Sequence, residues 1–136
     1  MRIELTCIQA DLDGRGACIA RKTSSLLGVS VPGAAVIDVY ILDGVDGFTA
    51  ESGRDIFLDP VAQKIYIDEP GTSRILPDWT FAVEVTYKAG VTNPEALTAR
   101  EAAGLALGRE LDPDEIVQTA RQYVFAIPGG PAEYAE

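Results

Sequence analysis

The sequence contains no histidine and only two cysteines, Cys7 and Cys18, among its 136 residues. Histidine is the commonest general base and the commonest metal ligand, so its absence excludes Ser-His-Asp and Cys-His catalytic arrangements within this chain. Two thiols without an imidazole do not complete a four-ligand zinc site. Two thiols also make no convincing disulfide framework, and we therefore expect a cytoplasmic protein.

Positive charge is scarce, because 11 Lys and Arg residues stand against 21 Asp and Glu residues, giving a net charge of −10. A surface this negative repels phosphate backbones and anionic lipid, so we expect neither a nucleic acid nor a membrane as partner. No apolar run approaches the ~20 residues that span a bilayer. The chain opens directly on a strand pattern, without the apolar stretch of a signal peptide. A hydrophobic fraction of 47% is typical of a globular protein with its own core.

The first part of the chain, residues 1–44, predicts a strand, a helix and a second strand. Residues 2–7 alternate between apolar and polar side chains, as a half-buried strand does. Asp13 is a helix N-cap, and Gly28 has the position of a helix-terminating glycine. Residues 36–42 form the second apolar strand pattern. The helix residues expected to face the sheet are Ile19, Thr23, Leu26 and Leu27.

A middle segment, residues 45–79, follows. We predict a short helix over 49–57, ended by Asp59-Pro60, and a strand over 64–68. The stretch 59–63 is most simply a turn into that strand.

The opening pattern then returns at an offset of 80 residues, so that residues 2–28 fall on residues 82–108 without a gap. Strand phase, cap, helix length and final glycine all coincide. The second helix carries mostly alanine where the first carries larger side chains, so we expect it to approach its sheet closely. The last strand is predicted over about 118–127, preceded by another helix cap at 112–115. The matched caps and glycines are Asp13 with Asn93 and Gly28 with Gly108.

One strand–helix–strand unit has too few strands to be stable alone. We therefore predict an α+β, ferredoxin-like fold in which two such halves, 1–44 and 80–127, form one antiparallel sheet with the helices on one face. This arrangement is equivalent to a homodimer fused into one chain, with a pseudo-two-fold axis between the halves. Residues 128–136 are predicted to be a linker or flexible tail.

Three short motifs near the first turn suggest binding sites, and each has a simpler explanation. Asp11-Leu12-Asp13-Gly14 resembles the start of a calcium loop, but Lys22 occupies the twelfth position, where a bidentate Glu is needed. Gly14-Arg15-Gly16 hints at phosphate binding, but Ile19 replaces the third glycine of a dinucleotide fingerprint. Cys18 lies near the same helix N-terminus, a position that can favour a reactive thiol, but no base accompanies it.

Several longer motifs occur in one order along the chain. They are Ile37-Asp38-Val39-Tyr40, Asp59-Pro60-Val61-x-Gln63, Val83-Glu84-Val85, Gly90-Val91-Thr92-Asn93, Thr98-Ala99-Arg100-Glu101 and Arg121-Gln122-Tyr123. In this order the motifs resemble the N-terminal region of a bacterial type of phosphoribosylformylglycinamidine synthase, a region that is a tandem version of the small PurS subunit. The resemblance runs from residue 2 to about residue 127 and departs from the family at the turns, where the family has Asp-Pro-x-Gly.

The resemblance implies a non-catalytic assembly domain. The family makes formylglycinamidine ribonucleotide in purine biosynthesis from ATP, glutamine and formylglycinamide ribonucleotide. The glutaminase cysteine and the machinery for ATP and Mg lie in other domains or subunits, so this chain alone should have no activity and no cofactor. Its expected partners are the synthetase and glutaminase parts, between which the PurS-like region supports association and ammonia transfer. The residues predicted to contact a partner are Asp59, Gln63, Arg121, Gln122 and Tyr123.

Two other functional classes stay open at this point. A small-molecule-sensing ferredoxin-like module would hold a ligand at the seam between the halves. A small independent enzyme would use Asp38, Asp59 or Asp68, but no motif pairs two of these carboxylates. A further homodimer through the open sheet edges is also left open.

Overall fold

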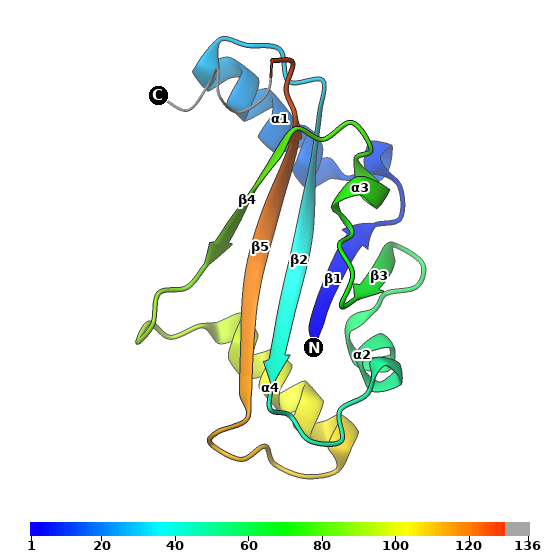
Figure 1. Ribbon diagram of the computed structural model, residues 1–136, viewed down its shortest axis with the longest axis vertical. Helices are drawn as coiled ribbons and strands as arrows, with labels where there is room; N and C mark the ends of the chain where they lie inside the picture. The colour runs from blue at the N-terminus through cyan, green and yellow to red at the C-terminus, as the bar shows by residue number, and fades with distance from the viewer. Residues whose placement is uncertain (130–136) are drawn as a thin grey trace.

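The computed structural model describes residues 1–129, so the predicted tail lies largely outside the described residues. Both predicted strand–helix–strand halves are present (Figure 1). The middle segment forms the predicted short helix and strand, together with a one-turn helix that the sequence did not reveal. The strands are β1 (Arg2–Cys7), β2 (Gly33–Asp43), β3 (Gln63–Ile67), β4 (Phe81–Thr86) and β5 (Ile116–Ala126). The helices are α1 (Gly14–Leu27), α2 (Ala50–Phe57), α3 (Thr72–Ile75) and α4 (Pro94–Leu107), with a 3-10 turn over Ala10–Leu12.

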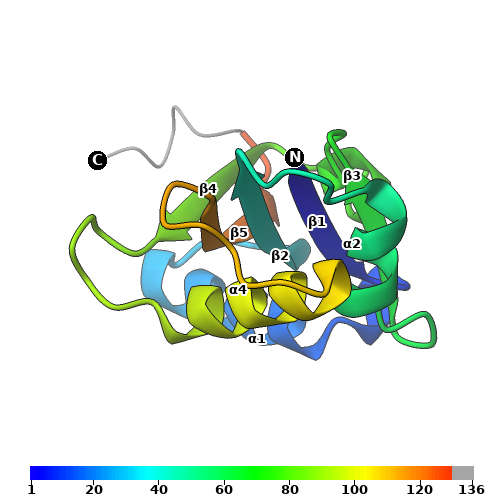
Figure 2. The ribbon, with the colours of Figure 1, turned by 90° about the horizontal axis from the view of Figure 1, so that it is seen from below.

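The five strands form one antiparallel sheet in the order β3-β1-β2-β5-β4. Helices α1 and α4 lie on the same face of this sheet (Figure 2). The predicted α+β fold, with two strand–helix–strand halves in one sheet and helices packed on one face, is confirmed. The halves meet along β2 and β5, whose pairing runs from Gly33 opposite Ala126 to Asp43 opposite Ile116. The last strand therefore begins two residues earlier than predicted.

The two long helices begin and end as predicted. Asp13 caps α1 and Asn93 caps α4, each through its side chain. Gly28 and Gly108 end the two helices in the left-handed conformation, at φ 67° and φ 66°, which glycine adopts without strain. These four residues are matched across the repeat, so the local signals of the two halves produce the same local structure.

The predicted sheet-facing side of the helices is correct along most of their length and wrong in the last turn of α1. In α4, Ala96, Ala99 and Ala103 are buried, which confirms the expected close approach to the sheet. In the last turn of α1 the prediction is wrong, because Leu26 is 84% exposed and Leu27 is 50% exposed. The last turn of α1 extends past the start of β2, so the sheet offers nothing to bury these side chains (Figure 1).

Strand β1 is buried on both faces, which corrects the half-buried strand expected from its alternation. Ile3 and Leu5 face the helices and are 0% and 2% exposed, and Glu4 on the opposite face is only 3% exposed. The segment around α3 lies over that opposite face, where the Gly71 amide donates to Glu4 Oε2 at 2.7 Å. The middle segment also supplies β3, which pairs with β1 at the edge of the sheet.

Residues 112–115 form a turn, so the helix cap predicted there is wrong. The Asp112 amide donates to Glu115 Oε2 at 2.6 Å, and the Glu115 amide donates to the Asp112 carbonyl at 3.0 Å. The carboxylate of Glu115 also binds the guanidinium of Arg109 at 2.6 Å and the amide of Asp46 at 3.0 Å. Glu115 thus joins the start of β5 to the loop after β2. Its hydrogen bonds stabilise a turn at residues 112–115, where a helix start was predicted.

Acid should weaken this turn. The Arg109 guanidinium, helped by the two amides, lowers the pKa of Glu115 from its ordinary 4.5 to about 2. A lowered pKa contributes stability that is complete above the ordinary value and is lost as pH falls from about 4.5 towards 2. We therefore expect wild type to be more stable than Glu115→Gln at pH 7, with the difference shrinking over that pH range. Urea unfolding at a series of pH values measures it, and a difference that is independent of pH would contradict the assignment.

Candidate functional site

The seam between the halves carries a pair of opposite charges at its centre. The β2–β5 pairing spans equal stretches on either side of Asp38 and Arg121, which lie directly opposite each other. Their side chains face the two helices, and Arg121 Nε contacts Asp38 Oδ1 at 3.2 Å. The pseudo-two-fold axis therefore passes through this pair of residues.

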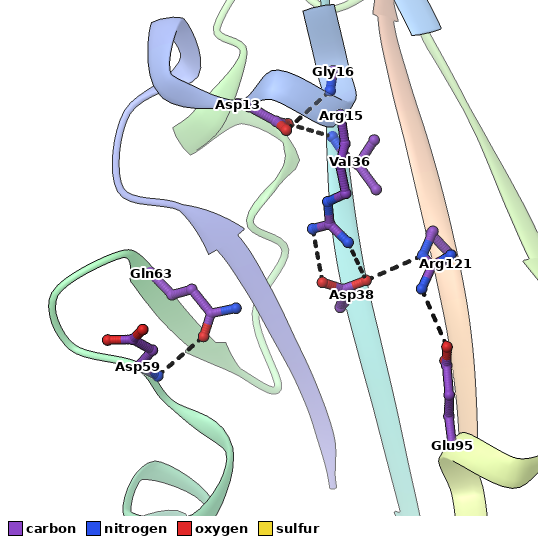
Figure 3. A network of polar contacts seen from close by, with 9 residues as sticks. All are labelled: Asp13, Arg15, Gly16, Val36, Asp38, Asp59, Gln63, Glu95 and Arg121. Carbon is purple, nitrogen blue, oxygen red and sulfur yellow. Dashed lines mark hydrogen bonds and ion pairs between the residues drawn. The ribbon is translucent and has the colours of Figure 1, made fainter. Parts of the chain in front are cut away.

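The first turns of the two helices extend this pair into a chain of four alternating charges (Figure 3). Arg15, near the start of α1, binds both oxygens of Asp38, at 2.9 and 2.8 Å. Arg121 reaches Glu95, near the start of α4, at 3.4 Å. Hydrogen bonding to Asp38 raises the pKa of Arg15 and of Arg121, against the opposing effect of burial. The bidentate Arg15–Asp38 contact is the strongest of the three in geometry.

The charges of this chain are reversed across the axis. Arg15 is equivalent to Glu95 at the offset of 80, and Asp38 is equivalent to Arg121 because the β2–β5 pairing is symmetric about these two residues. A symmetric homodimer would place identical residues opposite each other and would bring like charges together at its axis. The two halves of this chain carry opposite charges instead, so each half is complementary to the other and not to itself.

A buried carboxylate holds α1 against the sheet beside this chain. Asp13 is 5% exposed, and its two oxygens accept from the amides of Gly16 at 2.9 Å and Val36 at 2.8 Å (Figure 3). One side chain thus caps the helix and anchors it to β2. In the other half, Asn93 accepts from the Ala96 amide at 3.1 Å and contacts Thr119 Oγ1 on β5 at 2.9 Å. Both caps fix a helix N-terminus over the seam.

Two shallow hollows flank Arg121 and Tyr123 on the helix face. One, of about 340 Å³, lies beside α1 and is also lined by Arg15 and Cys18. The other, of about 250 Å³, lies between β4 and α4 and is also lined by Tyr87. Their arginines already hold carboxylates, which reduces the attraction of either hollow for an anion.

Tyr40 lies on the same helix face of β2, below Asp38. Its ring stacks on Phe57 of α2, with centroids 4.4 Å apart. Burial raises the pKa of Tyr40, and the nearby Asp38 carboxylate adds to the shift. Tyr40 is therefore a neutral packing residue at neutral pH.

The five residues predicted to contact a partner lie on three separate surfaces. Asp59 and Gln63 are joined in the turn before β3, where the Asp59 amide donates to Gln63 Oε1 at 3.0 Å (Figure 3). Arg121 and Tyr123 lie at the seam. Gln122 points to the opposite face of the sheet, within 3.4 Å of Thr72 Oγ1. A single flat interface does not reach all five.

The simpler explanations of the other motifs agree with the structure. Asp11 to Gly14 enters the 3-10 turn and the capped start of α1. Cys7 and Cys18 are both free thiols. Asp38 is occupied by two arginines, and Asp68 Oδ1 accepts from the Arg2 amide at 2.6 Å. Within residues 1–129, no three His, Cys, Asp or Glu side chains gather as a metal site requires.

Arg15 and Glu95 were missed as members of this site. The sequence places Arg15 in the Gly14-Arg15-Gly16 motif and Glu95 in the first turn of the second helix, and predicts no ion pair for either. The signal that would have found them is the opposite charge at equivalent positions of the halves, which at Asp38 and Arg121 indicates contact across the axis and at Arg15 and Glu95 matches each helix start to the strand residue of its own half.

In comparison with known proteins, no family model, no curated protein and no solved structure matches this chain. Over the described residues, no helix combines the length and apolar character that crossing a membrane demands.

Proposed function

We propose that this chain is a non-catalytic assembly domain of a phosphoribosylformylglycinamidine synthase. In this proposal residues 1–127 act as a tandem PurS-like domain in the cytoplasm, and residues 128–136 are its linker or tail. The domain holds the synthetase and glutaminase parts of the enzyme together and supports ammonia transfer between them. ATP, Mg and the reacting cysteine belong to those other parts, and the chain itself takes no cofactor.

The observation that carries the proposal is the seam with reversed charges. It supports a fused pair of related units, as expected of a tandem PurS-like domain. Asp38 and Arg121 neutralise each other across the axis, while Arg15 and Glu95 each pair with the strand residue of their own half, so all four charges hold elements of the fold together. The reversed charges also make the two halves inequivalent, which favours a partner bound asymmetrically.

The test combines binding and activity. The purified chain should hydrolyse neither ATP nor glutamine, and it should co-elute in gel filtration with the synthetase or glutaminase part of a bacterial synthase of this type. If the chain associates with neither the synthetase part nor the glutaminase part, the proposal is wrong.

The variants follow the three surfaces described above. Arg121→Ala with Tyr123→Ala tests the seam, Gln122→Ala the opposite face and Gln63→Ala the turn before β3. We expect one of the three to weaken association by about tenfold, since a few residues carry most of the energy of an interface. Each variant is checked for an unchanged melting temperature, so that loss of fold is not mistaken for loss of contact.

A second candidate is a small-molecule-sensing module, favoured by the two hollows that share Arg121 and Tyr123. A thermal-shift screen of nucleotides and amino acids separates the two. Binding at a hundred times the dissociation constant stabilises a protein by about 2.7 kcal/mol, which is an easily measured shift. The assembly proposal expects no such shift from any of these compounds.

A further inference from the structure

The two halves differ most in how their first strands are covered. Strands β1 and β4 are equivalent under the repeat, so Ile3 and Leu5 correspond to Val83 and Val85. Ile3 and Leu5 are 0% and 2% exposed, whereas Val83 and Val85 are 46% and 53% exposed. The row continues into Tyr87, which is 48% exposed. An apolar row that is core in one half is therefore open in the other.

The cover of β1 is a helix–strand unit, residues 50–67, which comprises α2 and β3. Strand β3 pairs with β1 so that Ile67 lies opposite Ile3 and Ile65 lies opposite Leu5. Helix α2 lies over the same row, and it comes so close that a Cβ added at Gly53 would be 2.8 Å from Ile3 Cδ1. Strand β3 pairs with the main-chain groups at the edge of β1, and helix α2 buries the apolar row.

Nothing among residues 1–129 does this for β4, which pairs with β5 alone. The free side of β4 lies at the opposite end of the sheet from β3 (Figure 1). Its six residues carry one charged side chain, Glu84, which points to the other face and is neutralised by Arg2 at 2.5 Å. The edge therefore lacks the lysines, prolines and bulges that commonly prevent another strand from adding.

We propose that the free edge of β4, with Val83, Val85 and Tyr87, is the docking site for a helix–strand unit of a partner polypeptide, of the kind that residues 50–67 form on β1. The partner strand adds antiparallel to β4, and its main chain supplies the hydrogen bonds. The partner helix covers the apolar row from the helix face. The unit completes the pseudo-symmetry that this chain leaves incomplete.

The helix–strand unit of residues 50–67 indicates which residues the partner should carry. Its strand should place bulky aliphatic residues opposite Val83 and Val85, as Ile67 and Ile65 stand opposite Ile3 and Leu5. Its helix should turn a glycine or alanine towards the row, at the position that Gly53 has in α2. No charge is expected on either contact surface, since the row is apolar and Glu84 is engaged on the other face.

The test extends the full chain after Glu136 by a second copy of residues 45–69. Tethering raises the effective concentration of the unit to about the millimolar range, so a weak site is still occupied. Hydrogen exchange at the amides of 81–86 should slow by about tenfold or more relative to the unextended chain, because an edge strand becomes an internal one. A matched extension with lysine at the positions of Ile65 and Ile67 should give no slowing. Equal exchange in both extended chains would overturn the proposal.

The unextended chain tests the rival occupants. Slow exchange at 81–86 that increases with protein concentration would mean that a second copy holds the edge. Slow exchange that disappears when the chain is ended at Gly129 would mean that residues 130–136 hold it. Either result overturns the proposal. No synthase component enters these measurements, so their outcome is independent of the function proposed above.

Discussion

Replacing Gly16 with alanine is expected to lower the free energy of unfolding by about 3 kcal/mol, the upper range for overpacking combined with a disturbed cap. A Cβ at this position would collide with the backbone carbonyl of Ala34 and lie 2.8 Å from Asp13 Oδ2. Neither neighbour is the free end of a flexible side chain, because one is β2 backbone and the other is held by two amides. Helix α1 would have to move off the sheet.

Gly14 provides the matched control within the same helix turn. A Cβ at Gly14 meets no heavy atom within 4 Å, so Gly14→Ala should change stability by no more than about 0.5 kcal/mol, as surface substitutions usually do. Urea unfolding followed by circular dichroism measures both variants. Similar losses in the two would show that the close contact of Gly16 with β2 does not decide the result, since alanine has the higher helix propensity at both positions.

Asp13→Ala should be nearly as damaging, at about 2 to 4 kcal/mol. Loss of an N-cap costs about 1 kcal/mol, and a buried amide left without a partner costs about 1 to 3 kcal/mol. Both penalties apply here, since Asp13 serves the Gly16 amide and the buried Val36 amide together.

Asn93→Ala is the comparison for Asp13→Ala, because Asn93 caps α4 at the equivalent position. Its side chain satisfies one helix amide and the hydroxyl of Thr119, and no strand amide depends on it. Its loss should therefore cost less, about 1 kcal/mol for the cap, because the buried Thr119 hydroxyl can rotate to another partner whereas the Val36 amide is fixed. If the two substitutions prove equally costly by urea unfolding, the anchoring of β2 by Asp13 contributes nothing beyond the cap.

Local signals in this sequence predicted local structure well. The caps Asp13 and Asn93 and the stop glycines Gly28 and Gly108 all lie where the sequence placed them. Each depends on a few neighbouring residues and on backbone conformations that only certain side chains allow. The exception is the turn at 112–115, where an Asp-Pro pair resembled a helix start and Arg109 captured Glu115 instead.

Burial could not be predicted in the same way. Strands β1 and β4 have the same alternation, yet β1 is buried on both faces and β4 is exposed on both faces from Val83 onwards. The difference comes from residues 50–75, which pack on β1 and not on β4. The residue pattern within either strand does not predict which strand this segment covers. The seam appears only when the two halves are compared, because Asp38 and Arg121 meet only where β2 and β5 pair.

The length of the β2–β5 ladder has a consequence for how the chain reaches its native state. The paired residues of the two strands are between 73 and 93 positions apart in sequence, and contacts this distant slow folding because a long loop must close first. During synthesis the first half emerges with one side of β2 unpaired, until β5 has left the ribosome. Such an unpaired strand is prone to aggregation. Delayed release of residues 116–126 should therefore be the step at which this protein depends most on chaperones.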